Sequence, residues 1–166
     1  AGLADYSRKD FTQLEDYVKI FGAKGLVWIK VGEGSELSGS AVKFLSEGEK
    51  SAILDRFGAK PTDTLLIVAG NKKTVFDSLG NLRNKLAKDL GLADPKRNEL
   101  LWIVDFPCLE WNADENRWDA MHHPFTSPKE EDLPKMDTDP GAIRANAYDL
   151  VWNGNEISGG SIRIHR

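Results

Sequence analysis

The chain has 166 residues, of which 40% are hydrophobic and 29% charged, and its formal net charge is −4 at pH 7. This length allows one domain or two small ones, with enough buried surface for a stable core. The net negative charge argues against broad, nonspecific binding to nucleic acid, which needs a basic face. Apolar runs such as LLIVA and LLWIV are far shorter than the roughly 20 residues of a membrane-spanning helix.

The single cysteine and the N-terminus both bear on the location of the protein. Cys108 has no second cysteine in the chain with which to form a disulfide, which suits a reducing compartment. Its apolar neighbours in DFPCLEW favour a small buried hydrophobic residue. Because the charged start and long apolar stretch of a signal peptide are absent, we expect a cytoplasmic protein.

The first part of the chain predicts alternating helices and strands. Ser7 is a suitable N-cap for a helix over residues 8–22, where apolar residues recur at three and four positions. Residues 26–31 predict a strand and residues 32–40 a loop. Residues 41–58 then predict one or two short helices, with a break near the glycine in SEGEK.

A buried strand and a long helix follow. Residues 63–70, DTLLIVAG, predict the strand. Residues 72–90 predict an amphipathic helix with one apolar stripe, which ends at Gly91. The basic residues in and after this helix favour a solvated face over contact with RNA: Lys72, Lys73, Arg83, Lys85, Lys88, Lys96 and Arg97.

The character of the sequence changes at residues 91–99, GLADPKRNE, which are typical of a domain boundary. The stretches beyond it predict short strands (99–107, 108–112 and 117–123), a proline-rich connection that we expect to be the least ordered (124–142), and a closing hairpin around Asn153-Gly154. We therefore predict an α+β fold in two domains. Residues 1–97 form helices packed on a small, mainly antiparallel sheet, and residues 98–166 form a strand-rich domain.

The closing hairpin carries candidate binding residues. If Asp149, Glu156 and Arg163 project from one sheet face, the carboxylates suit Mg²⁺ and the guanidinium suits an anionic group. The alternative is a surface hairpin whose charges pair across the strands, and spacing alone favours it. The small residues of SGG at 158–160 shift the balance towards close approach by a ligand.

Two of the three histidines in the chain, His122 and His123, are adjacent. They lack further ligands at metal-binding spacing, and no nucleophile-elbow pattern accompanies them. From the residues alone they indicate a weak binding site, with one inward hydrogen-bond donor and one supporting residue.

Three segments, LLWIVDFPCLEW, AMHHPFTSP and AYDLVWNGNEISGGSIRIHR, resemble consecutive parts of the bacterial-type aspartyl-tRNA synthetase, a class II synthetase. Upstream, SRKDFTQLEDYVKIFGAKGLVWIKV, KFLSEGEK and SLGNLRNKLAKDLGL resemble its GAD insertion domain. The GAD domain also occurs in a subunit of the tRNA-dependent amidotransferase, but an amidotransferase subunit would not continue into the later segments. The resemblance covers nearly the whole chain in the right order.

The resemblance implies roles for individual residues. His122 contacts the aspartate substrate and His123 supports the same pocket. Arg163 holds the side-chain carboxylate of aspartate. Glu156 serves ATP, commonly through Mg²⁺, and Asp149 is a second carboxylate on the metal side.

The resemblance also implies partners and limits. The expected partners are L-aspartate, ATP and tRNA. The parent enzyme is expected to be a homodimer that does not bind a membrane. The first two class motifs would precede Ala1 and the third would follow Arg166, so we expect an internal fragment that is inactive alone and contributes no catalytic residue of its own. Ser158 stands where the family often has a glycine, and PTDTLLIVAGN replaces a common Gly-Asp start of a strand.

Two other functions stay open. Residues 1–97 could act as a non-catalytic module that contacts tRNA or a protein partner, with binding that weakens steeply with salt. A metal-binding protein centred on His122 and His123 is the third hypothesis.

Overall fold

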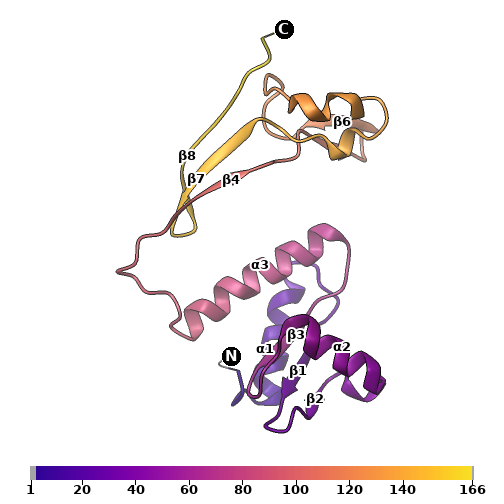
Figure 1. Cartoon of the computed structure of the whole chain (residues 1–166), viewed down its shortest axis with the longest axis vertical. Coiled ribbons are helices and arrows are strands. Elements are labelled where there is room, and N and C mark those ends of the chain that lie inside the picture. The colour runs from indigo at the N-terminus through magenta and orange to yellow at the C-terminus, as the bar shows by residue number, and fades with distance from the viewer. Residues whose placement is uncertain (1–2, 166) are drawn as a thin grey trace. The chain divides into compact units, whose positions relative to one another are not determined.

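The computed structural model describes residues 3–165. The chain forms two compact units, Ala1–Asp94 and Pro95–Arg166, here named the N-terminal unit and the C-terminal unit (Figure 1). Both contain small antiparallel sheets, which confirms the predicted α+β class. The division into domains at residues 97 and 98 stays a prediction.

The N-terminal unit combines helices with one three-stranded sheet. Its elements are α1 (Arg8–Lys19), β1 (Val27–Val31), β2 (Leu37–Gly39), the 3₁₀ helix η1 (Val42–Phe44), α2 (Glu47–Phe57), β3 (Thr64–Ile67) and α3 (Lys72–Asp89). The strands lie in the order β2-β1-β3, and both pairs are antiparallel. Within residues 3–165, no helix is long and apolar enough to cross a membrane.

Capping boxes fix the starts of α1 and α2. At α1, the Ser7 hydroxyl accepts a hydrogen bond from the Asp10 amide, and the Asp10 carboxylate accepts one from the Ser7 amide at 2.7 Å. Ser46 and Glu49 make the same pair of bonds at α2. These bonds favour the ionised carboxylates and hold the pKa of Asp10 and of Glu49 below their usual values. The predicted cap at Ser7 is confirmed.

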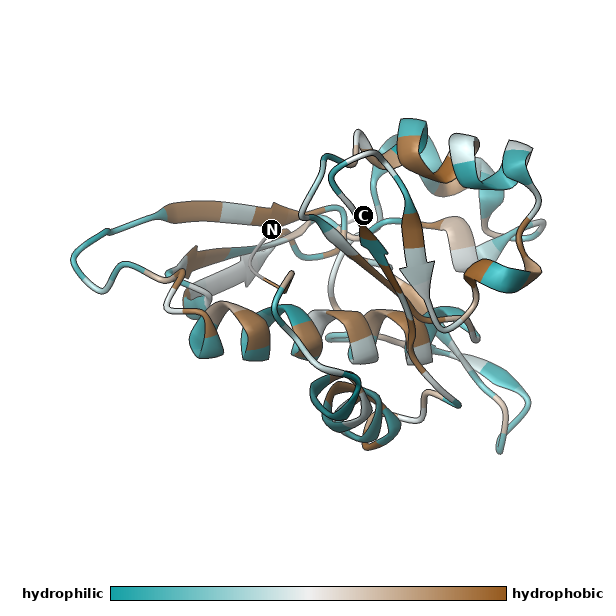
Figure 2. Cartoon of the chain, turned by 90° about the horizontal axis from the view of Figure 1, so that it is seen from below, coloured by the Kyte–Doolittle hydropathy of each residue, from teal (hydrophilic) through white to brown (hydrophobic). Residues whose placement is uncertain are grey.

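An apolar core lies beneath α1, which packs against α3. Phe11, Leu14 and Val18 of α1 are buried there, together with Ala23, Leu26, Val68 and Leu82. The ring of Phe11 stacks almost parallel on that of Trp28, with 4.4 Å between the ring centroids. Figure 2 shows the alternating apolar and polar bands of helices that bury one face.

Two details differ from the sequence predictions. Residues 37–39, expected in a loop, form β2 on the edge of β1. Gly39 permits this close approach, because a Cβ there would lie 2.1 Å from the carbonyl oxygen of Trp28. The helical break falls before the cap residue Ser46, and Gly48 lies in the first turn of α2.

The C-terminal unit is rich in strands. Its elements are β4 (Leu100–Val104), β5 (Leu109–Asn112), β6 (Arg117–Ala120), η2 (Glu130–Lys135), η3 (Pro140–Ala142), β7 (Ala147–Trp152) and β8 (Asn155–Ser161). One antiparallel sheet has the order β4-β7-β8, and β5 and β6 form a separate hairpin. Asn153 and Gly154 have φ values of 48° and 84°, which confirms the predicted tight turn.

The proline-rich segment 124–142, which the sequence predicts to be the least ordered, contains η2 and η3 around a buried carboxylate. Asp132 is 1% exposed. Its carboxylate accepts hydrogen bonds from Nε of Arg144 at 2.7 Å and from Nζ of Lys135 at 2.6 Å. The two cations, Arg144 first, hold the pKa of Asp132 far below its usual range.

A β-bulge interrupts the hairpin of β7 and β8. Val151 pairs with Glu156, but Leu150 pairs with Ser158, so Ile157 has no partner opposite it. A bulge of this kind shifts the register by one residue and changes which side chains share a face.

Candidate substrate pocket

An open pocket of about 400 Å³ lies in the C-terminal unit. Its lining residues come from the bend after β6 and from β7, β8 and the segment after β8: Met121, His122, His123, Thr126, Ala147, Asp149, Glu156, Gly159, Gly160, Ser161 and Arg163. All five site residues predicted from the sequence therefore line one pocket. Their individual roles stay predictions.

The bulge at Ile157 makes this arrangement possible. On the turn side, Glu156 pairs with Val151 and so shares the face of Asp149. Beyond the bulge, Asp149 pairs with Gly159, and the same face continues towards Arg163. If Ile157 were paired in regular alternation instead of bulged, Arg163 would fall on the opposite face from both carboxylates.

Two carboxylates converge over Gly159. A Cβ at this position would lie 2.5 Å from Oδ1 of Asp149 and 3.0 Å from Oε1 of Glu156. Only glycine leaves room for both side chains. Ser158, the departure from the family pattern, pairs with Leu150 and does not line the pocket, so it does not narrow this site.

His122 and His123 lie in a bend after β6, whereas the sequence predicts them on a strand. The ring of His122 packs edge-on against Phe106, with 4.8 Å between the ring centroids. Nδ1 of His123 accepts a hydrogen bond from the Phe125 amide at 3.2 Å. The carbonyl of His123 accepts another from the Thr126 amide at 2.9 Å. His123 therefore helps to form the turn in which both histidines lie.

Asn146 connects the histidine segment to the segment after β8 that carries Arg163, a role that the sequence does not reveal. Its Nδ2 donates to the Ser127 hydroxyl and to the carbonyl of Pro128, both at 2.9 Å. Its carbonyl accepts a hydrogen bond from the amide of Ile162 at 2.9 Å. Thr126 adds a β-bridge to Arg163. The partners are distant in sequence, so no local pattern identifies them.

The charged groups of the pocket are free to meet a ligand. Among residues 3–165, Asp149, Glu156 and Arg163 form no ion pair with another side chain. The predicted cross-strand pairing of these charges is therefore absent from the described part of the chain.

The carboxylates of the pocket suit Mg²⁺ better than a metal ion that is held by a larger group of histidine, cysteine and acidic side chains. The described residues contain no group of three or more histidine, cysteine or acidic side chains that could hold a metal ion, which gives no support to a metal protein centred on the histidines. Mg²⁺, in contrast, is commonly held by one or two carboxylates together with water and phosphate oxygens. The paired carboxylates over Gly159 fit that chemistry.

Comparison with known proteins first defines a domain class. Residues 1–79 match the model of the GAD domain. The N-terminal unit therefore contains a domain of that family, as the resemblance in the sequence implies.

The whole chain is similar to aspartate–tRNA ligases of bacteria. It is 54% identical over 166 residues to the aspartate–tRNA ligase of Oceanobacillus iheyensis. It is 51% identical over 164 residues to the aspartate–tRNA(Asp/Asn) ligase of Caldanaerobacter subterraneus subsp. tengcongensis. Each match covers 99% of this chain but only 28% of the relative. The chain is thus homologous to a segment of the bacterial aspartate–tRNA ligase, a class II aminoacyl-tRNA synthetase.

Proposed function

We propose that the C-terminal unit forms part of the substrate site of an aspartate–tRNA ligase, which activates L-aspartate with ATP and transfers it to the 3′ end of tRNA. The observation that carries this proposal is the convergence of His122, Asp149, Glu156 and Arg163 on one pocket. The similarity to ligases whose names specify aspartate supports it.

Each side chain has a chemical role in this proposal. The planar guanidinium of Arg163 forms a two-point contact with the side-chain carboxylate of aspartate. His122 donates a hydrogen bond to the same substrate, and His123 holds the turn in place. Asp149 and Glu156 hold the Mg²⁺ that accompanies ATP. When bound, this ion neutralises charge on the phosphate groups.

The rest of the site belongs to a longer protein in this proposal, since the chain spans 28% of the length of its relatives. The proposed parent is a homodimer in the cytoplasm. In this proposal, the arginines that stabilise the transferring phosphate lie in the part of the longer protein that this 166-residue chain does not cover. We therefore expect it to show no aspartate-dependent exchange between ATP and pyrophosphate, and measurable exchange would contradict this part of the proposal.

Arg163→Lys in the full-length ligase tests the pocket. Lysine keeps the charge but cannot reproduce the planar fork, so we expect the KM for aspartate to rise by about tenfold or more, with a loss of preference for aspartate over asparagine. The control is Arg117→Lys, whose exposed side chain lies on β6 outside the pocket. An unchanged preference for aspartate in the Arg163 variant would refute the assignment.

A further inference from the structure

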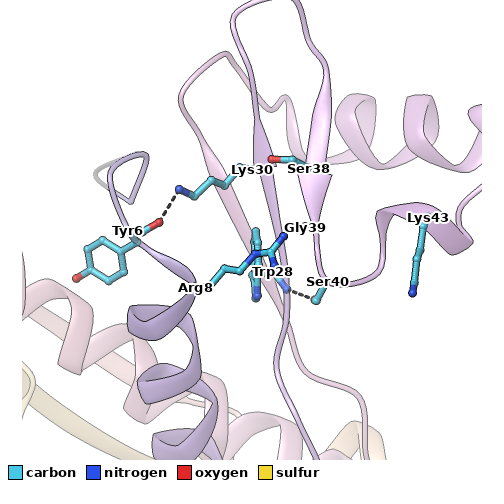
Figure 3. A pocket seen from close by; sticks show the side chains of 8 residues that line it. All are labelled: Tyr6, Arg8, Trp28, Lys30, Ser38, Gly39, Ser40 and Lys43. Carbon is cyan, nitrogen blue, oxygen red and sulfur yellow. Dashed lines mark hydrogen bonds between the residues drawn. The ribbon is translucent and has the colours of Figure 1, made fainter.

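A second cavity, of about 630 Å³, lies in the N-terminal unit. Its lining combines residues at the start of α1 with residues of β1, β2 and the segment that follows: Tyr6, Arg8, Trp28, Lys30, Ser38, Gly39, Ser40 and Lys43 (Figure 3). It shares no residue with the substrate pocket, and the proposed ligase function does not use it.

The described side chains that line this cavity carry positive charge and no negative charge. Three cations, Arg8, Lys30 and Lys43, line it, and no carboxylate is among its described lining residues. None of the three forms an ion pair with a side chain in residues 3–165. In a chain with a formal net charge of −4, such a group of unpaired cations creates a local positive potential that attracts an anion.

Four other lysines of the N-terminal unit have carboxylate partners on their own helices. The pairs are Lys19 with Glu15 at 2.8 Å, Lys50 with Glu47 at 2.6 Å, Lys73 with Asp77 at 3.1 Å and Lys85 with Asp89 at 2.7 Å. Other cations of the unit, such as Lys9 and Lys24, also lack such a partner in the described part of the chain, so the cavity is distinguished by the grouping of three unpaired cations around one hollow.

Lys30 is held in place before any ligand arrives. Its half-buried ammonium donates hydrogen bonds to the carbonyls of Ala4 and Tyr6, both at 2.6 Å, and Figure 3 shows it directed towards Tyr6. An ammonium has three donors, so one remains for an oxyanion. An ordered donor loses less side-chain entropy on binding than a mobile one.

Trp28 supplies a rigid aromatic wall. Its indole is half-buried and stacks on Phe11, with an interplanar angle of 7°. The Trp28 amide also donates to the Ser40 hydroxyl at 3.2 Å, which fixes the rim beside β2. Flat, preordered aromatic rings beside cations suit the base and the phosphate of a nucleotide.

We propose that this cavity binds a small phosphate monoester of the mononucleotide class, with its phosphate held by Arg8, Lys30 and Lys43 and its base against Trp28. The cavity volume of about 630 Å³ is within the range of small-ligand sites, about 300 to 1,000 Å³. Two or three cationic donors match the charge of a phosphate dianion, whereas a carboxylate would need only one or two.

The test is a titration of the isotopically labelled 166-residue chain with AMP, followed by NMR. We expect saturable shifts at the indole of Trp28 and at the amides of Gly39 and Ser40, and weaker binding as salt increases. Inorganic phosphate should shift the rim amides but not the indole, and adenosine should bind much more weakly than AMP.

The variant Arg8→Ala/Lys43→Ala removes two exposed cations of the cavity and should weaken AMP binding by roughly tenfold or more. The matched control is Lys9→Ala/Lys24→Ala, which removes the same charge from exposed positions outside the cavity. Equal weakening in both variants would overturn the proposal, because a general charge effect would then explain the binding.

Three further results would also overturn it. One is the absence of shifts at Trp28, Gly39 and Ser40 with AMP. Another is confinement of the shifts to the C-terminal unit. The third is binding of single-stranded RNA at the cavity that AMP does not displace, because the site would then recognise a polymer rather than a mononucleotide.

Discussion

The two units of the chain reach stability in different ways. The N-terminal unit buries a continuous apolar cluster beneath α1. In the C-terminal unit, Ile143 and Ala145 are the buried apolar residues among those described, and all five residues of β4 are exposed. Hydrogen bonds and the ion pairs around Asp132 hold that unit instead. The contrast shows that a well-ordered hydrogen-bond pattern can coexist with an incomplete apolar core.

The apolar strand β4 is exposed along its whole length in this chain. Leu100 and Trp102 of β4 are 63% and 59% exposed, and soluble proteins rarely leave contiguous apolar strands uncovered. We expect the corresponding face to be covered in a full-length ligase. The candidate substrate pocket thus lies on a sheet whose edge strand β4 is left uncovered in this chain.

The largest effect should follow from truncating the core of the N-terminal unit. Phe11→Ala removes a ring that is 1% exposed, and we expect the free energy of unfolding of this unit to fall by roughly 3 to 5 kcal/mol. Amide hydrogen exchange should report the loss in β1 and β3 but not in β7. The control, Phe57→Ala, removes a ring that is 61% exposed and should change stability by no more than about 0.5 kcal/mol.

Asp132→Asn should produce the corresponding effect in the C-terminal unit. The substitution leaves Arg144 and Lys135 without their buried carboxylate, so we expect faster exchange in β7 and β8 and a lower melting temperature. Asp137→Asn, at an exposed position nearby, is the matched control. Similar behaviour of the two variants would show that the buried ion pairs do not support this unit.

The same carboxylate gives a pH dependence with a definite sign. Because the folded-state pKa of Asp132 is depressed by Arg144 and Lys135, its stabilising contribution is complete above the ordinary carboxylate pKa of about 4 and is lost as pH falls further. The stability difference between the original chain and Asp132→Asn should therefore shrink in acid. Monitoring of unfolding from neutral pH to below pH 3 checks this; a difference independent of pH would contradict it.

A smaller effect is expected at the first helix cap. Ser7→Ala removes the acceptor for the Asp10 amide and should cost about 1 kcal/mol of stability in the N-terminal unit. Ser51→Ala, at an exposed position inside α2, should not destabilise because alanine favours helix interiors. Chemical denaturation of both variants measures the difference. A loss at Ser51 equal to that at Ser7 would contradict the capping role.

The smallest effect should come from the exposed strand. Leu100→Thr alters a side chain that is 63% exposed, so stability should change by less than about 0.5 kcal/mol. Binding of an apolar fluorescent dye should decrease, because the uncovered surface becomes more polar. A large loss of stability would show that β4 is packed in solution.

Local chemistry made much of the fold predictable. Ser7 caps α1 and Asn153-Gly154 forms the tight turn because each conformation depends on a few neighbouring residues. Edge strand β2 and the pair of Asp132 with Arg144 were not predictable, since their partners lie elsewhere in the chain. The alternation of side chains between the two faces of a strand could not predict the pocket either. Glu156 and Arg163 are an odd number of positions apart and fall on opposite faces of a regular strand.

The unpaired Ile157 therefore makes the bulge, rather than the number of residues, a requirement of the pocket. Substitution of Ile157 by another residue keeps the count of positions between the turn and Arg163. Deletion of it would restore an uninterrupted ladder with the same pairs on either side, and Arg163 would stay on the face of Asp149 and Glu156 because an even number of positions would then separate it from Glu156. We expect this hairpin to accept a new side chain at position 157, or the loss of that residue, more readily than the insertion of one residue between Gly159 and Arg163, which would turn Arg163 to the opposite face.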